Sequence, residues 1–250
     1  MLPHLILVPM AAVLLWLYLR DRRAIGQARE SVLSACAGLL GPDVHTHYQQ
    51  DGFPVVSGDY RGNRSVLRAT VDTLILRKLP SLWLEASILT PIPYTARLSY
   101  LVRPVNTEFF SPSARLGRRL DIPADWPQEA AMLRTDETGT PPPLKIVGEH
   151  IKRICSDRRV KEVVVTPRGI RIVYLADEGE RGTYLLLRQA RFGRGPIDPA
   201  LAGSLLDSAL ELAKALEAEK RSADLRPQLR LVPETGRKGR HEQDSVALQA

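Results

Sequence analysis

The first apolar run of the chain limits most strongly how the protein can fold. Residues 2–19 contain no Lys, Arg, Asp or Glu. A helix needs about 20 such residues to cross the hydrocarbon core of a bilayer. Two aromatic residues precede the first charge, as is typical of a membrane interface, and three arginines follow within four positions. The pattern predicts a transmembrane anchor over residues 1–19. The predicted membrane-interface residues are Trp16, Tyr18, Arg20, Arg22 and Arg23.

A cleaved signal peptide and a buried core helix are the alternatives to an anchor. A signal peptide carries positive charge before its apolar run and small residues after it, which is the reverse of the order here. A core helix seldom stands at the N-terminus with so sharp a charged edge. By the positive-inside rule, the N-terminus faces out and the remaining chain lies in the cytoplasm, at the inner membrane of a bacterium. That compartment is reducing, so we expect Cys36 and Cys155 to be free thiols.

An amphipathic helix is expected to leave the membrane over residues 20–41. Its apolar residues recur at steps of three and four, and Gly41-Pro42 is typical of a helix end. The stripe can pack on the protein's own domain. The alternative is a short helix–helix dimer interface, which the two alanines of the stripe would make weak. The stripe consists of Ile25, Ala28, Val32, Ala35 and Leu39.

Residues 42–122 read as an antiparallel β-rich module. Gly62-Asn63 predicts a hairpin turn, because both residues tolerate positive φ. Leu82, Leu84 and Ala86 alternate with Trp83, Glu85 and Ser87, which predicts a strand over 81–89 with the first set on its buried face. A further strand is expected over 96–103. Residues 123–143 are rich in proline and read as a connection, with a short helical piece near 126–133.

Residues 144–219 read as a second α+β module. The spacing predicts a helix from Leu144, strands over 160–166 and 170–175, and a segment at 183–192 that fits a strand better than a helical turn. Asp198 is the expected N-cap of a last helix that ends near Lys220. The basic tail, residues 220–250, is expected to be disordered. The fold class is therefore α+β, and the sequence leaves open whether the two modules share one core.

The distribution of charge argues against a nucleic-acid partner. The formal net charge is +7, but the tail contributes +3 of it and residues 42–219 only +2. Aromatic residues make up 6% of the chain, which is few for base stacking. Residues 59–122 carry ten basic and five acidic groups and form the one basic region within the expected domain.

The sequence contains no catalytic constellation, so we predict no catalytic, cofactor or metal site and no enzyme activity. Asp43, His45 and His47 are the densest polar cluster, but two histidines two residues apart are a weak metal signal without further ligands. Cys155 lies among basic residues that would lower a thiol pKa, yet no base is placed beside it. The chain also lacks the glycine-rich motifs that bind phosphates.

The order of elements resembles that of uncharacterised bacterial single-pass membrane-anchored α+β proteins. This resemblance implies an architecture and transfers no activity or site residue. The segments that carry it are GDYRG at 58–62, RKLPSLWL at 77–84 and RGTYLLLR at 181–188.

We therefore expect a membrane-tethered, non-enzymatic protein whose domain binds a protein partner, a second copy of itself, or scaffolds a membrane complex. The alternative is a peripheral sensor of anionic lipid or a small ligand, acting through the basic region 59–122. A metal-dependent enzyme using Asp43, His45 and His47 is the least favoured reading.

Overall fold

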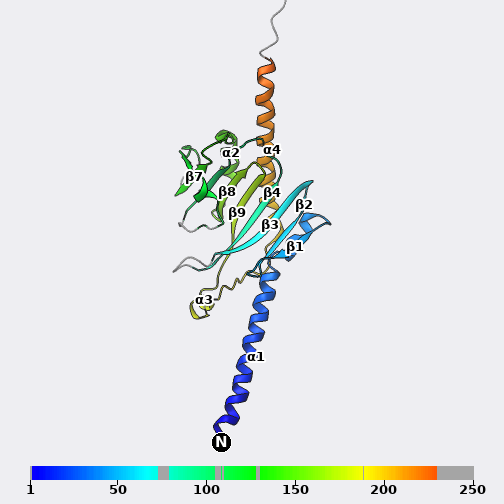
Figure 1. Cartoon of the computed structure of the whole chain (residues 1–250), viewed down its shortest axis with the longest axis vertical. Coiled ribbons are helices and arrows are strands. Elements are labelled where there is room, and N and C mark those ends of the chain that lie inside the picture. Colours follow the sequence, from blue (N-terminus) through cyan, green and yellow to red (C-terminus); the bar gives the residue numbers. More distant parts are fainter. Residues whose placement is uncertain are drawn as a thin grey trace, which may run out of the picture.

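The computed structural model describes residues 2–72, 79–104, 108, 110–127, 130–187 and 189–229, without the side chains of residues 2–8, 187 and 226–229. Figure 1 shows the elements in chain order. They are α1 (Leu2–Glu30), η1 (Ser34–Leu40, 3₁₀), β1 (His45–Tyr48), β2 (Pro54–Tyr60), β3 (Asn63–Asp72), β4 (Ser81–Leu89), β5 (Leu98–Val102), η2 (Ser113–Arg115, 3₁₀), β6 (Arg118–Leu120), β7 (Ala131–Thr135), α2 (Leu144–Ile154), β8 (Val160–Thr166), β9 (Gly169–Glu178), α3 (Arg181–Leu187) and α4 (Pro199–Leu229).

The strands of the described residues form one antiparallel sheet of nine, in the order β1-β2-β3-β4-β9-β8-β5-β7-β6. Helix α4 packs on β4 and β9, and α2 packs beside α4. The α+β prediction is confirmed. The two predicted modules share this sheet, because β4 of the first pairs along its length with β9 of the second. One hydrophobic cluster, from Val32 to Leu216, fills the space between sheet and helices.

Alternation of side chains explains which face of the sheet the helices cover. Leu82, Leu84 and Ala86 of β4 are at most 1% exposed, as the pattern predicted, and they belong to the main core. Trp83 and Glu85 point to the opposite face, yet they are only 8% and 4% exposed. Trp83 packs against Phe110 there, so the central strands are buried on both faces.

Three predicted local structures were wrong. The hairpin turn is Arg61-Gly62 rather than Gly62-Asn63, since Tyr60 pairs with Asn63 and both turn residues have positive φ. Residues 131–135, expected to end a helical piece, form β7 because β5 offers them a free edge. Residues 181–187 form α3 rather than a strand. The sheet does not reach them, because the pairing of β9 with β4 ends at Glu178.

The two outer helices also differ from the expected bounds. Asp198 caps α4 as predicted, accepting from the Ala200 backbone N–H at 2.9 Å, but α4 runs beyond Lys220 to Leu229. The predicted 20–41 helix is α-helical only to Glu30; a turn over residues 31–33 follows, and then η1 to Leu40. A 3₁₀ segment has 3.0 residues per turn, so a stripe inferred at α-helical spacing loses register there. Ala35 is accordingly exposed.

α1 and the last part of α4 leave the domain at opposite ends (Figure 1). Within the part of the chain described with side chains, no helix has an apolar stretch long enough to cross a membrane. The transmembrane prediction for residues 1–19 thus has no support from those residues, and residues 1–8 of the predicted span lie outside them. The described remainder of the apolar run, residues 9–19, is exposed throughout.

Candidate functional site

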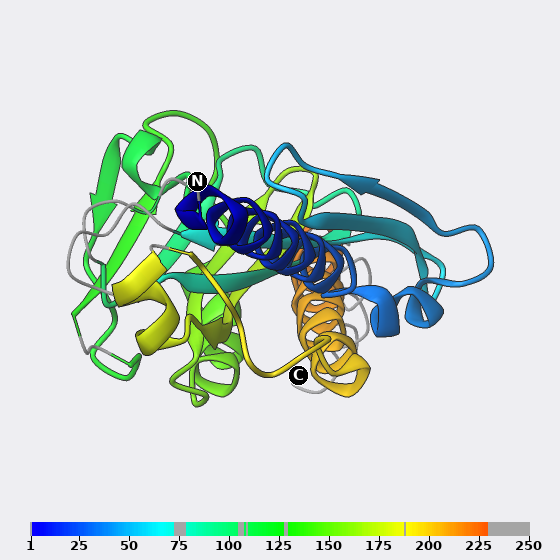
Figure 2. The ribbon, with the colours of Figure 1, turned by 90° about the horizontal axis from the view of Figure 1, so that it is seen from below.

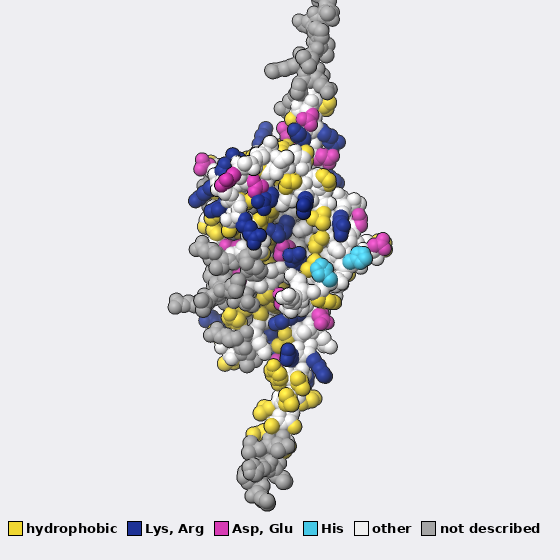
Figure 3. Space-filling model, in the orientation of Figure 1, with side chains coloured by type: hydrophobic (Ala, Val, Ile, Leu, Met, Phe, Trp, Pro, Cys, Tyr) yellow, Lys and Arg dark blue, Asp and Glu magenta, His cyan; other side chains and the backbone are white. Residues whose placement is uncertain are grey.

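The five predicted membrane-interface residues all lie on the exposed part of α1. Trp16 and Tyr18 are 58% and 54% exposed, and the guanidinium of Arg20 lies over the Trp16 ring, 5.5 Å from its centroid. Arg22 and Arg23 are also exposed. In Figure 3, hydrophobic side chains cover this stretch of α1, and basic side chains follow where it meets the domain.

A pocket of about 220 Å³ begins directly beyond these residues, between α1, Phe53 and the segment that leads into α4. We call it the α1 pocket. Figure 2 shows that segment crossing the face of the domain from which α1 leaves. The lining residues are Asp21, Ala24, Ile25, Ala28, Arg29, Ser31, Val32, Phe53, Glu180, Ala190, Arg191, Phe192 and Gly195.

Helix α1 supplies one wall because its lining residues recur at helical spacing. Asp21, Ile25 and Ala28 lie on one face of the helix, three or four residues apart. Val32 continues the stripe and is 5% exposed within the main core. The predicted stripe therefore divides: Val32 and Leu39 pack on the domain, as one of the two alternatives held, Ala35 is exposed, and the beginning of the stripe lines the pocket.

The opposite wall comes from a distant part of the chain. Arg191 forms an ion pair with Asp21, although the two residues are 170 positions apart in the sequence. Phe192 packs edge-on against Phe53, with ring centroids 6.3 Å apart. The backbone of Phe192 bridges to Gly179, which fastens this wall to the end of β9.

Arg29 gives the α1 pocket its distinctive electrostatics. Its guanidinium donates to the Asp51 carbonyl at 3.1 Å and lies over the Phe53 ring, 5.5 Å from the centroid. It forms no ion pair with any described carboxylate, and its Nε is buried without a hydrogen-bond partner. Arg191, by contrast, is neutralised by Asp21. Glu180, whose carboxylate accepts from the Thr183 hydroxyl at 3.1 Å, also lines the pocket, so the acidic and basic side chains of the lining balance. Among them, Arg29 is the guanidinium without a carboxylate partner, and with its apolar neighbours it suits an anionic group joined to an apolar body.

The described lining of the α1 pocket combines apolar side chains with four charged ones. It contains neither a thiol nor an imidazole, and its hydroxyl, on Ser31, donates to the Ala28 carbonyl at 3.1 Å. A volume of about 220 Å³ is smaller than the ~300–1,000 Å³ of pockets that enclose a drug-sized ligand. It would hold a headgroup or the end of a chain, with the remainder outside.

The structure does not assemble a metal centre from the predicted polar cluster. His45 and His47 lie on the exposed edge strand β1. Among the described residues, no three His, Cys, Asp or Glu side chains gather closely enough to hold a metal ion. The two cysteines are free thiols. Burial raises the pKa of Cys36 to about 11 and that of Cys155 to about 12, so the basic neighbours of Cys155 in sequence do not activate it.

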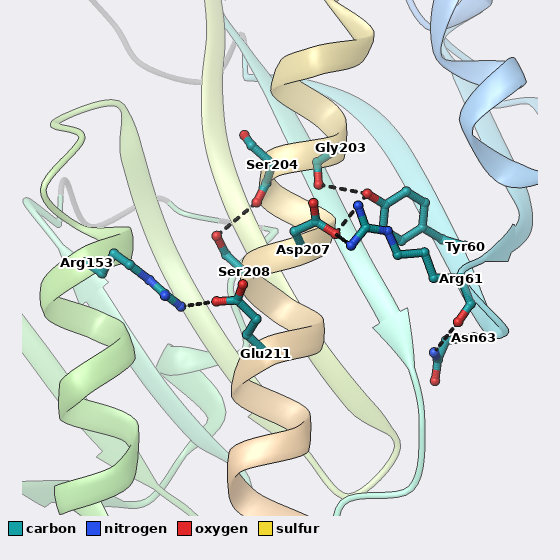
Figure 4. Close-up of polar contacts among 9 residues, drawn as sticks. All are labelled: Tyr60, Arg61, Asn63, Arg153, Gly203, Ser204, Asp207, Ser208 and Glu211. Atoms are coloured by element: carbon teal, nitrogen blue, oxygen red, sulfur yellow. Dashed lines mark hydrogen bonds and ion pairs between the residues drawn. The ribbon is translucent and has the colours of Figure 1, made fainter.

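The basic region 59–122 is dispersed over the fold. Figure 4 shows Arg61 paired with Asp207 of α4 at 2.9 Å, beside Tyr60, whose hydroxyl donates to the same carboxylate at 3.0 Å. Burial is the main cause that raises the pKa of Tyr60. Arg97 pairs with Asp136 at 2.6 Å. These arginines therefore hold elements of the protein together, and Arg77 and Lys78 lie outside the described residues.

A second polar cluster lies buried on the sheet face opposite α4. Glu85 accepts from Thr70 at 2.7 Å and pairs with Arg171 at 3.0 Å. On β8, Glu162 is fully buried, and one carboxylate oxygen accepts from Ser99 and Ser111, each at 2.6 Å. Burial raises the pKa of Glu162. Arg171 also lines a pocket with Ser87, Leu89 and Arg97, and the other contacts of the cluster join β3, β4, β5, β8 and β9, so we assign the cluster to the structure of the sheet.

No protein-family model, curated protein or solved structure matches this chain. The site thus rests on geometry alone. Sequence reasoning singled out five exposed residues within 16–23 and the α1 stripe, and the membrane role of those five stays a prediction; it missed Arg29, Phe53 and residues 190–192 as one site. The only signal in the sequence was Arg29, close to the apolar stripe. The opposite wall of the pocket depends on the long-range contact between Asp21 and Arg191.

Proposed function

We propose that this chain is a membrane-tethered binding domain that takes an anionic amphiphile into the α1 pocket. The observation that carries the proposal is the position of Arg29. This unpaired guanidinium lines a partly apolar pocket two turns of helix beyond Asp21, where the charged part of α1 begins.

The tether is the first part of the proposal. A helix that is apolar on all sides requires an apolar environment around it. Residues 9–19 of α1 have this character and contact no other part of the described domain closely enough to be buried. The exposed large side chains include Val13 at 55%, Leu14 at 60% and Leu15 at 57%. Together with residues 2–8 of the sequence, they supply the 18 uncharged residues of the proposed anchor.

The orientation follows from the arginines after the apolar run. We assign Arg20, Arg22 and Arg23 to the cytoplasmic surface and the N-terminus to the outside, at a bacterial inner membrane. Membrane extraction at alkaline pH tests the tether. We expect the full chain to stay in the membrane fraction and the Leu14→Arg, Leu15→Arg double variant to be released. The variant Leu225→Arg, which alters an equally exposed leucine at the far end of α4, should behave as the wild type.

Ligand selectivity is the second part. The anionic group would lie against Arg29, and the apolar part would follow Ile25 and Ala28 toward the bilayer. Charge-assisted hydrogen bonds contribute about 1.5–3 kcal/mol, which is roughly 10- to 150-fold in affinity. We therefore expect the full chain in neutral detergent to bind phosphatidylglycerol in preference to phosphatidylcholine.

Native mass spectrometry of lipid-bound protein measures this preference directly. The variant Arg29→Gln should lose the preference for phosphatidylglycerol by at least roughly tenfold. The matched control is Arg64→Gln, which removes the same charge from an exposed position on β3. An equal loss of the preference for phosphatidylglycerol in both variants, or no loss of it in Arg29→Gln, would contradict a site at Arg29.

A protein partner remains the second candidate, and strand β1 favours it. This edge strand pairs only with β2 among the described strands, and its four residues, including Tyr48 at 55%, are exposed. Such an edge can accept a further strand through main-chain hydrogen bonds. In-cell crosslinking of the full chain would test this: a partner lost from Thr46→Pro, which removes a backbone donor, would support it.

A further inference from the structure

The segment between β9 and α4 contains the most exposed large hydrophobic side chain that the structure describes. Leu186 of α3 is 84% exposed, and its neighbour Leu185 is 58% exposed. Scattered exposed leucines are common on protein surfaces, but adjacent ones on a short helix call for an apolar partner. The question is what covers them.

The loop that carries α3, residues 180–191, is closed at its base. The Glu180 backbone N–H donates to the Arg191 carbonyl at 2.8 Å, and Gly179 bridges to Phe192 just outside it. The Thr183 hydroxyl donates to the Glu180 carboxylate at 3.1 Å and so steadies the first turn of α3. Because its two ends are fastened together, this α3 loop projects from the domain as a unit.

The ion pair between Arg191 and Asp21 sets the position of the α3 loop along α1. Asp21 immediately follows Arg20, at the proposed boundary between bilayer and cytoplasm. Arg191 is only four positions after Leu187, the last residue of α3, a reach of at most about 14 Å. Figures 1 and 2 agree that α3 lies on the end of the domain from which α1 leaves.

We propose that α3 is a second membrane contact, whose Leu185 and Leu186 enter the interfacial region of the same bilayer. The occupant is lipid, because α3 lies on the end of the domain from which the proposed anchor leaves, and Arg181 of α3 is exposed there, as are Arg22 and Arg23 of α1. This inference rests on the proposed tether. Contacts at both α1 and α3 would fix the tilt of the domain relative to the membrane. Ala190, Arg191 and Phe192, which follow α3 and line the α1 pocket, would then place this pocket at the membrane surface.

Fluorescence quenching by lipids in reconstituted full chain tests the contact. A single cysteine carrying an environment-sensitive NBD label replaces Leu15, Leu185 or Leu225, which are 57%, 58% and 58% exposed. Wild type, taken through the same labelling, measures the background from Cys36 and Cys155. The vesicles contain phosphatidylcholine, phosphatidylglycerol and a doxyl-labelled phosphatidylcholine as quencher.

We expect strong quenching at positions 15 and 185 and several-fold weaker quenching at position 225, on the far end of α4. Quenching at 15, with position 185 no different from 225, would overturn the α3 contact while the tether stands. Quenching at none of the three positions would overturn the tether and the α3 contact together. The three replaced side chains are exposed, so their loss leaves the core intact.

Discussion

Gly58 on β2 lets η1, the segment that follows α1, pack closely against the sheet. We predict that replacing Gly58 destabilises the protein. A Cβ at Gly58 would lie 2.3 Å from the Leu40 carbonyl oxygen and 2.8 Å from the Leu40 Cβ. The obstructing groups belong to η1, the segment that joins α1 to the domain. The backbone of Gly58 is otherwise compatible with alanine, because its φ is not positive. The variant Gly58→Ala therefore isolates this one close contact.

Overpacking a well-filled site costs about 1–3 kcal/mol, and the Gly58→Ala variant should lie at the upper end because backbone atoms cannot rotate away. A chain of this length loses about 2–4 °C of melting temperature per kcal/mol, so we expect a decrease of roughly 6–12 °C. Circular dichroism of the full chain in neutral detergent measures it.

The matched control is Gly203→Ala in α4, whose Cβ would meet the Tyr60 hydroxyl at an ordinary 3.6 Å. Glycine within a helix is about 1 kcal/mol less favourable than alanine, so this variant should be as stable as the wild type or slightly more so. If the Gly58→Ala variant has the same melting temperature as the wild type, η1 does not pack on β2 as described.

Three further predictions concern buried polar groups. Cys36 and Cys155, whose pKa values burial raises to about 11 and about 12, should react with iodoacetamide at neutral pH at least roughly tenfold more slowly than in urea. The raised pKa of Glu162 gives stability that is full below its ordinary value of 4.5 and is lost as pH rises toward the folded value. Urea unfolding should therefore show the wild type losing stability relative to Glu162→Gln above about pH 4.5, and a constant difference would contradict this. The variant Glu85→Ala leaves Arg171 without its carboxylate partner and should cost about 3 kcal/mol in the same assay, the low end for a buried pair because Arg171 is 25% exposed. A loss below about 1 kcal/mol would match a surface pair instead.

Local patterns predicted most strands and helices correctly, because alternation and capping act over a few residues. The buried face of β4 and the Asp198 cap are examples, and both follow from side-chain chemistry alone. The order of the strands was beyond such reasoning. β5 follows β4 in the chain but lies beyond β9 and β8 in the sheet, so neighbours in sequence are not neighbours in space.

Two of the errors share a physical cause, which is that tertiary contacts decided the outcome. Residues 131–135 became a strand because β5 pairs with them, and α3 became a helix beyond the reach of the sheet. The α1 pocket is the extreme case. Arg29 was visible only as a charge near an apolar stripe, while its counterpart wall depends on the contact between Asp21 and Arg191.

Photo-crosslinking with an anionic lipid tests the central proposal most directly. The full chain in membranes would be exposed to phosphatidylglycerol that carries a photoreactive group near its headgroup, and the labelled peptides would be identified by mass spectrometry. We predict labelling of residues 24–32 and 189–195, competed by unlabelled phosphatidylglycerol and lost in Arg29→Gln. Labelling confined to residues 9–19, unchanged in that variant, would show lipid around α1 only and would contradict a binding site in the α1 pocket.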